Sequence, residues 1–325
     1  MNSGIHPFHG HYTWGGLAAL ACCAVVVPAF WALLNILSPW DDHREMFKQH
    51  NAGFAIVRCF QLLGLAFGLA PVIGMTGSTQ GQHVLWAAAD AVWVPMLLLA
   101  STPIISRVVR HAHGGLNSIR DNSVPVSLVY GMFYLGYGQI IGATLPGPGL
   151  GLVKTYLISV VFGLLGIVCL TLIYLAAMSI RAFKLEEQPS DDGLNADAQK
   201  LSLAQLVRDG NWPATIGAMV IIYSLYTVIS SAVAGAFTNW GDAIVSFLVA
   251  VVIMLVLAAG TIWLVDRFVV VEVEEVQGDP DNPGVTTTKD LLNVRTVVRD
   301  GAVLPMAVIG AFVLALVTLV ANVVM

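Results

Sequence analysis

Eight long runs of apolar residues constrain this chain more than any other feature. They lie near residues 14–38, 53–75, 84–106, 123–146, 152–180, 212–236, 241–265 and 302–325. Each run is long enough to form a helix of about 20 residues, which spans a hydrocarbon layer of about 30 Å. Inside lipid every backbone group needs a partner within the protein, and long unalternating runs meet this need as helices. The sequence therefore predicts an all-α integral membrane protein with eight transmembrane helices.

The composition agrees with this class of protein. The chain is 57% hydrophobic and only 11% charged, whereas soluble domains are about 25% charged. The four cysteines all fall inside apolar runs, where a free thiol packs as a small hydrophobic group. We therefore expect neither disulfides nor a metal site built on cysteine. We expect no cleavable signal peptide either, because no Lys or Arg precedes the first run and that run is long enough to span.

The positions of Lys and Arg predict the orientation. Thirteen of the fifteen basic residues follow the first, third, fifth and seventh runs: Arg44, Lys48, Arg107, Arg110, Arg120, Arg181, Lys184, Lys200, Arg208, Arg267, Lys289, Arg295 and Arg299. Basic residues are enriched in cytoplasmic connections. We therefore expect a bacterial inner-membrane protein whose N- and C-termini both lie outside, on the periplasmic side.

A short polar step recurs at the start of every second run. Its copies read His50-Asn51-Ala52-Gly53, Arg120-Asp121-Asn122, Arg208-Asp209-Gly210-Asn211 and Arg299-Asp300-Gly301. A side chain of Asn or Asp there can cap the first free N–H groups of a helix and complement its dipole. Each copy alone is explained as a helix start, with the residues Asn51, Asp121, Asn122, Asp209, Asn211 and Asp300.

Four copies at matching places predict a tandem duplication with parallel halves, near 1–150 and 151–325. In domain terms we expect a first membrane repeat within 1–182, a cytoplasmic linker at 183–211 and the remainder of the second repeat at 212–325. The second repeat begins with the helix at 152–180. The inner connections 183–209 and 268–300 are too short to form a catalytic core, so we expect them to contact partners.

Several segments resemble a known bacterial family, domain of unknown function 350. The acidic step Ser38-Pro39-Trp40-Asp41-Asp42, followed by Lys48–Ala55, is similar to the start of that family's domain. The glycine-rich segment Gly64–Pro71 and the segment Ile119–Val124 also resemble it. Gln49-His50 stands where the family has Gly, and the second half, with Trp212-Pro213-Ala214, is a weaker match. The resemblance implies four helices in each of two copies, and an inner-membrane protein whose relatives lie near envelope-stress genes. It implies no activity.

Arg58 and Asp90 are ionisable residues that lie well inside predicted helices. A charge at the bilayer centre costs about 2.5–3.5 kcal/mol on insertion scales, so it must face protein or water. Three interpretations stay open: an ion pair between the two residues, an Arg58 that reaches inner lipid phosphates, or a role in transport or proton relay.

Polar side chains on other helices extend this set of candidates. They either join helices by hydrogen bonds or line a cavity between the two halves. The intramembrane candidates are Arg58, Asp90, Gln61, Tyr134, Gln139 and Tyr226. The histidines His6, His9 and His11 fit a solvated terminus better than a metal site, because no Cys or carboxylate stands close by. We expect no metal, no cofactor and no nucleic-acid partner.

The sequence is consistent with two functions. The first is a non-enzymatic membrane component, a scaffold or sensor linked to envelope maintenance. Its partners would be the bilayer, a second copy or another membrane protein, and a cytoplasmic protein at 183–209 and 268–300. The second is a channel or transporter with a path between the repeats that uses Arg58 and Asp90. No motif of nucleophile, base and metal is readable, so an enzyme is not expected.

Overall fold

The structure is a computed structural model of the chain. It describes residues 13–38, 41–42, 44–74, 80–145, 152–179, 183–184, 200–234 and 239–252, with single positions at 256 and between 303 and 318. Its six long helices are α1 (Thr13–Leu37), α2 (Ala52–Gly74), α3 (Gln80–His113), α5 (Val124–Ala143), α6 (Leu152–Ser179) and α8 (Trp212–Val233). Short elements join them: the π-helix η1 (Arg44–Lys48), α4 (Leu116–Arg120), α7 (Leu203–Arg208), and the antiparallel strands β1 (Phe183–Lys184) and β2 (Lys200–Leu201).

All six long helices are apolar enough and long enough to cross a membrane. They match the first six predicted spans, so the all-helical membrane class is confirmed for the part of the chain that is described. The seventh predicted span is seen as a shorter apolar helix, Trp240–Val252. The eighth span and the duplication into two repeats stay predictions, because most of residues 253–325 lie outside the described residues.

The third helix is longer than its apolar run predicted. It continues to His113, so Arg107 and Arg110 lie in its last turns and not in the connection after it. The prediction was wrong here because apolarity marks where a helix can contact lipid, not where its hydrogen bonds end. Basic side chains in a last turn also interact favourably with the helix dipole. The helix stops before Gly114 and Gly115, whose φ angles are +83° and +89°, a region open to glycine.

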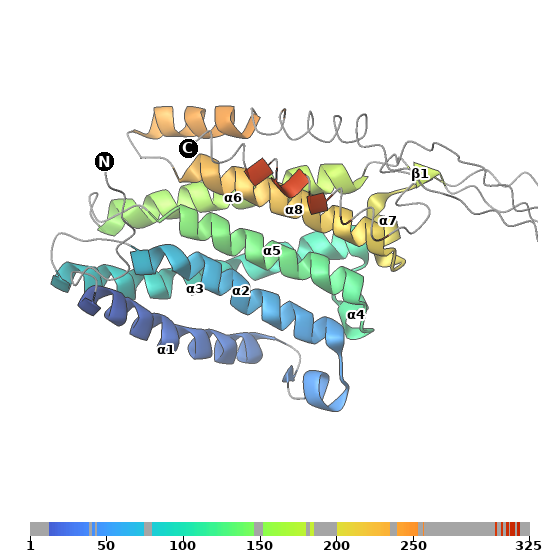
Figure 1. The fold of residues 1–325 in the computed structure, drawn as a ribbon, viewed down its shortest axis with the longest axis horizontal. Coiled ribbons are helices and arrows are strands. Elements are labelled where there is room, and N and C mark those ends of the chain that lie inside the picture. Colours follow the sequence, from blue (N-terminus) through green and yellow to red (C-terminus); the bar gives the residue numbers. More distant parts are fainter. Residues whose placement is uncertain are drawn as a thin grey trace, which may run out of the picture.

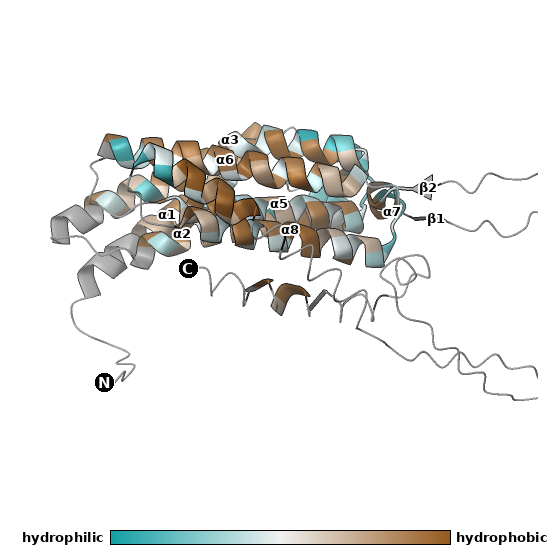
Figure 2. Cartoon of the chain, turned by 90° about the horizontal axis from the view of Figure 1, so that it is seen from above, coloured by the Kyte–Doolittle hydropathy of each residue, from teal (hydrophilic) through white to brown (hydrophobic). Residues whose placement is uncertain are grey.

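The long helices lie side by side, with α5 between α2 and α8 (Figure 1). Of the span of α5, 78% is buried, compared with 17% for α1, so α5 is the central helix. Figure 2 shows hydrophobic residues along the middle of the helices and hydrophilic residues at the end near α7.

The contact between α2 and α5 depends on glycine. Gly64 lies against the backbone of Tyr134 and Gly138, and Gly68 lies against Gly138 and Gly142. A side chain on Gly64 or Gly138 would collide with the backbone of the facing helix. Small residues at four-residue spacing allow such close approach of membrane helices. The two helices therefore form one rigid pair.

Three copies of the recurring polar step adopt the same local path. Each follows a short helix (η1, α4 or α7), and each has a residue with positive φ just before the next long helix. These residues are His50, Asn122 and Gly210, with φ of 50°, 61° and 85°. Asn51 and Asn211 then cap α2 and α8, because their Oδ1 atoms accept hydrogen bonds from Phe54 N at 2.8 Å and Ala214 N at 2.9 Å.

The two aspartates of this step do not cap the long helices. Asp121 and Asp209 stand at the C-terminal ends of α4 and α7, and Ser123, not Asp121, precedes α5. The expectation of an N-cap was therefore wrong for both residues. The extra turn between the short and the long helix moves the cap two residues along the chain. Asp300 lies outside the described residues.

Hydrogen bonds also join the first and second copies of the polar step. The Asn51 amide donates to the carbonyl oxygens of Ile119 and Arg120, both at 3.1 Å. In return, Asn122 Oδ1 accepts from Gly53 N at 3.0 Å. These bonds satisfy backbone groups that helix ends leave free. They place the first turns of α2 and α5 at the same end of the bundle.

Candidate functional site

A buried ion pair joins the connection after α1 to the second turn of α2. The Arg58 guanidinium donates to Asp42 Oδ1 from Nη2 at 2.6 Å and from Nε at 3.1 Å. Its Nη1 donates to Gln61 Oε1 at 2.9 Å, and the ring of Phe54 lies 5.0 Å from the guanidinium carbon. Arg58, Asp42 and Gln61 are each 4% exposed. Arg58 is thus neutralised within the protein by charge-assisted hydrogen bonds.

This geometry settles the partner of Arg58. The sequence left open a pair with Asp90, but the observed partner is Asp42. The second interpretation, an Arg58 that reaches lipid phosphates, is wrong as well, because its side chain is only 5% exposed. Sequence reasoning did not select Asp42, although Trp40-Asp41-Asp42 carried the family resemblance. The path that brings it back to α2 depends on the folded connection, which spacing along the chain does not determine.

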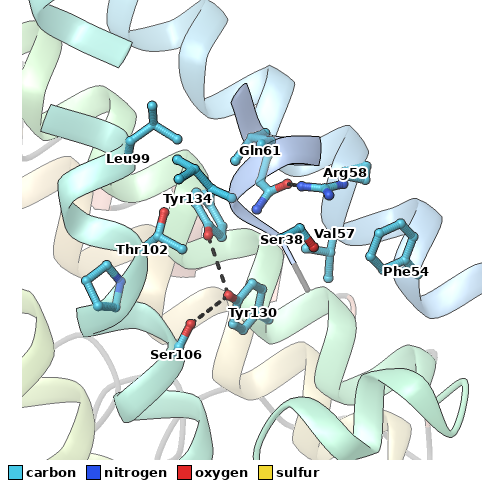
Figure 3. A pocket seen from close by; sticks show the side chains of 13 residues that line it. Ser38, Phe54, Val57, Arg58, Gln61, Leu99, Thr102, Ser106, Tyr130 and Tyr134 are labelled. Carbon is cyan, nitrogen blue, oxygen red and sulfur yellow. Dashed lines mark hydrogen bonds between the residues drawn. The ribbon is translucent and has the colours of Figure 1, made fainter. Parts of the chain in front are cut away.

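A cavity of about 340 Å³ lies beside this pair, between α1, α2, α3 and α5 (Figure 3). Its apolar walls include Leu34, Leu37 and Pro103. Its polar wall consists of Ser38, Arg58, Gln61, Thr102, Ser106, Tyr130 and Tyr134.

The polar wall contains a chain of hydroxyl groups. The Tyr130 hydroxyl lies 3.1 Å from Ser106 Oγ and 3.5 Å from the Tyr134 hydroxyl. The side chains of Thr102 and Gln61 also interact with Tyr134. The cavity can therefore offer several neutral hydrogen-bonding groups to an occupant, while its one cation is already paired.

Two of the apolar residues that line the cavity are exposed. Leu37, at the end of α1, is 66% exposed, and Pro103 on α3 is exposed. Helix α1 ends at Leu37, whereas α3 continues past Pro103 to His113. An occupant with an apolar portion could enter from the lipid at this level.

Asp90 belongs to a separate cluster on α3 and α6. It is 1% exposed, and its Oδ1 accepts a hydrogen bond from the Tyr156 hydroxyl at 2.9 Å. Its Oδ2 has no hydrogen-bond partner among the described residues. The Trp93 ring packs against Tyr156 at 4.7 Å between centroids, and Trp86 lies at 6.3 Å.

The structure brings together only part of the predicted set. Arg58, Gln61 and Tyr134 share the cavity, and Asp90 does not line it. Tyr226 is buried on α8 against Gly136 and Tyr223, which fits helix packing. Gln139 is half-buried on α5 and does not line the cavity.

A further buried polar residue, His113, was not selected from the sequence. It is 0% exposed, and its Nε2 lies 2.7 Å from the Tyr174 hydroxyl. Its Nδ1 lies 3.2 Å from the carbonyl oxygen of Ala204. These bonds join α3, α6 and α7. No sequence pattern indicates this contact, because His113 follows the apolar run and looks like part of a polar connection. Among the described residues, no group of three or more His, Cys, Asp or Glu side chains could hold a metal ion.

Comparison with known proteins gives one family. The family model described as Domain of Unknown Function (DUF350) matches residues 11–145. This range contains every residue that lines the cavity, whereas Tyr156, the partner of Asp90, lies beyond it. No curated protein and no solved structure matches the chain. The matched range, residues 11–145, includes α1 to α5 and the Arg58 cavity, so this part of the chain is similar to the DUF350 family.

Proposed function

We propose that this chain is a non-enzymatic component of the bacterial inner membrane, a sensor or scaffold in envelope maintenance. It crosses the membrane eight times as two parallel four-helix repeats, with both termini outside. Six apolar helices and the distribution of basic residues support this topology. On this account the ends of α2 and α5 that carry the recurring polar step face the cytoplasm.

The observation that carries the proposal is the position of the cavity next to the Asp42–Arg58 pair. Asp42 belongs to the polar connection 38–51, and Arg58 belongs to α2. An occupant that hydrogen-bonds to Arg58 competes with the bonds that hold Asp42, and one that bonds to Gln61 competes with the bond between Gln61 and Arg58. Binding inside the membrane is therefore coupled to the conformation of a cytoplasmic connection, which is what a sensor requires.

The occupant is a neutral amphiphile with oxygen atoms in its head and an apolar tail. The wall has no net charge, because Asp42 neutralises Arg58, and its remaining polar groups are hydroxyls and an amide. The exposed apolar side chains of Leu37 and Pro103 fit a tail that stays in lipid. A volume of about 340 Å³ suits a head group of this size, since drug-sized pockets begin near 300 Å³. Diacylglycerols and isoprenoid quinones both have this chemistry.

The test is hydrogen–deuterium exchange of the full chain in nanodiscs, read at residues 41–51. Addition of dioctanoylglycerol or decylubiquinone, in separate arms, should change the exchange of this segment. Tyr134→Phe, which removes a hydroxyl from the cavity, should weaken the response at least several-fold. Tyr174→Phe is the matched control, because Tyr174 is buried on α6 next to His113 and should respond as the unmodified chain. Exchange that neither amphiphile changes would contradict the proposal.

The alternative is a channel or transporter with a path between the repeats that uses Arg58 and Asp90. The unpartnered Oδ2 of Asp90 favours it. Against it, Arg58 and Asp90 belong to separate clusters, and the described contact of α5 with α8 is filled by Tyr226 against Gly136. Ion or solute flux in proteoliposomes that Arg58→Ala or Asp90→Asn abolishes would favour the transporter over the sensor.

The connections 183–209 and 268–300 are the proposed contacts for a cytoplasmic partner. Between β2 and α8, helix α7 begins with a capping box in which Ser202 and Gln205 bond to each other's backbone N–H groups, so the end of the first connection is ordered. A second copy of the chain or another membrane protein would contact the exposed apolar faces of the helices.

A further inference from the structure

Asp90 is placed differently from Asp42, another buried carboxylate. Asp42 has a cation within 2.6 Å, whereas Asp90 accepts a hydrogen bond from the neutral Tyr156 hydroxyl. Asp90 is 1% exposed, and no side chain or backbone group that the structure describes bonds to its second oxygen. An anionic oxygen without a donor is far more costly to bury than a neutral hydroxyl group.

The elements packed around α3 offer no described cation to Asp90. On α3 itself the nearest Lys or Arg is Arg107, 17 residues further on, about 25 Å by helical rise. On α6, Lys154 precedes Tyr156 by two residues, so the two side chains face different directions. On α2, Arg58 is held by Asp42; α1 carries the thiols Cys22 and Cys23 and no charged residue, and α5 carries only tyrosines as titratable groups.

One ionisable group near Asp90 lies outside the described side chains. This is His83, seven residues before Asp90 and about two helical turns away. The described donor to the carboxyl belongs to an aromatic cluster: the Tyr156 hydroxyl donates to it, and the rings of Trp93 and Trp86 pack against Tyr156. Such surroundings stabilise a neutral carboxyl over an anion.

We propose that Asp90 is a proton-binding site of the membrane interior. At neutral pH its carboxyl holds a proton, its carbonyl oxygen accepts from Tyr156, and its hydroxyl oxygen is the atom that the structure leaves unpartnered. Loss of the proton leaves an anion to which Tyr156 alone donates among the described side chains. The site is distinct from the Arg58 cavity, and it does not depend on what that cavity binds.

Infrared difference spectra of the full chain in liposomes test this proposal. A protonated carboxyl has a C=O stretching band that is separate from the bands of a carboxylate. Between the unmodified chain and Asp90→Asn, the difference at pH 7 should contain one protonated C=O band. Asp242→Asn removes an exposed aspartate at the start of the Trp240–Val252 helix and should leave that band unchanged. Asp90→Glu should keep an acid band at a shifted frequency, which identifies the band even where Asp90→Asn folds poorly.

Tyr156→Phe should change the midpoint of proton loss from Asp90, which a hydrogen bond with a purely structural role would not do. A donor stabilises the anion more than the acid, so its removal should move the midpoint of proton loss upward by roughly one pH unit, a tenfold rise in proton affinity. His83→Gln should leave the midpoint in place. Carboxylate bands for Asp90 at pH 7 would overturn the proposal, and so would a band that NaCl removes at constant pH, since that result indicates a sodium site.

Discussion

At the scale of single residues, the Asp42–Arg58 pair shows what the sequence could and could not indicate. Arg58 was selected because a cation inside an apolar run must be compensated, and this reasoning was correct. Its partner was not found, because Asp42 lies in the connection before α2 and reaches Arg58 only once that connection folds back. The sequence indicates that a charge lies within a membrane helix, but it does not indicate which residue of a folded connection pairs with that charge.

Removal of one member of this pair should be strongly destabilising. In Arg58→Ala the Asp42 carboxylate stays buried without its cation, and breaking a buried pair in this way costs about 3–5 kcal/mol. Arg208→Ala is the control, because Arg208 and Asp209 are more than half exposed and 4.0 Å apart, so it should cost less than about 1 kcal/mol. Thermal unfolding in nanodiscs measures both. A loss for Arg58→Ala no larger than the control would show that Asp42 finds water when Arg58 is absent.

Asn51 should contribute more to stability than a helix cap alone. Its side chain bonds to the carbonyl oxygens of Ile119 and Arg120 as well as to Phe54 N. Loss of a cap alone costs about 1 kcal/mol, and each further bond adds about 1 kcal/mol. Thermal unfolding should therefore show that Asn51→Ala costs more than a lost cap. A loss of about 1 kcal/mol or less would mean that the bonds between the first two copies add nothing.

At the scale of helices, the apolar runs predicted α1, α2, α5, α6 and α8 within a few residues, because burial in lipid demands apolar length. The end of α3 and the short helices η1, α4 and α7 were not predicted. They depend on backbone turns with positive φ at His50, Asn122 and Gly210, and two of these residues are not glycine. Composition gives weak signals for such turns.

The glycine contact between α2 and α5 can be tested by one methyl group. Gly138→Ala places a Cβ against the Gly64 backbone, so the helices must separate, and we expect a loss of about 1–3 kcal/mol or more. Gly163→Ala on α6 is the matched control, because its Cβ would meet only Thr144 at 3.9 Å. That change should be neutral or stabilising by up to about 1 kcal/mol, since alanine favours helix over glycine. Unfolding midpoints that fall equally in both variants would contradict the close contact.

At the scale of the whole molecule, orientation follows from charge alone, so it should be measured independently. In a chain without its native cysteines, Ser78→Cys lies in the connection 75–79 and Asn117→Cys lies in α4. A maleimide that does not cross membranes should label Ser78→Cys from outside intact cells and label Asn117→Cys only after lysis. The reverse pattern would place both termini in the cytoplasm and turn the recurring polar step outward.

The central claim is that the cavity beside Arg58 holds a neutral amphiphile, and native mass spectrometry of the chain purified from bacterial membranes tests it most directly. The unmodified chain should retain one such molecule, and Ser106→Leu, which fills part of the cavity, should lose it. Met96→Leu, an exposed change on the same helix away from the cavity, should retain it. A chain that carries only phospholipid, or a bound amphiphile that persists in Ser106→Leu, would contradict the account.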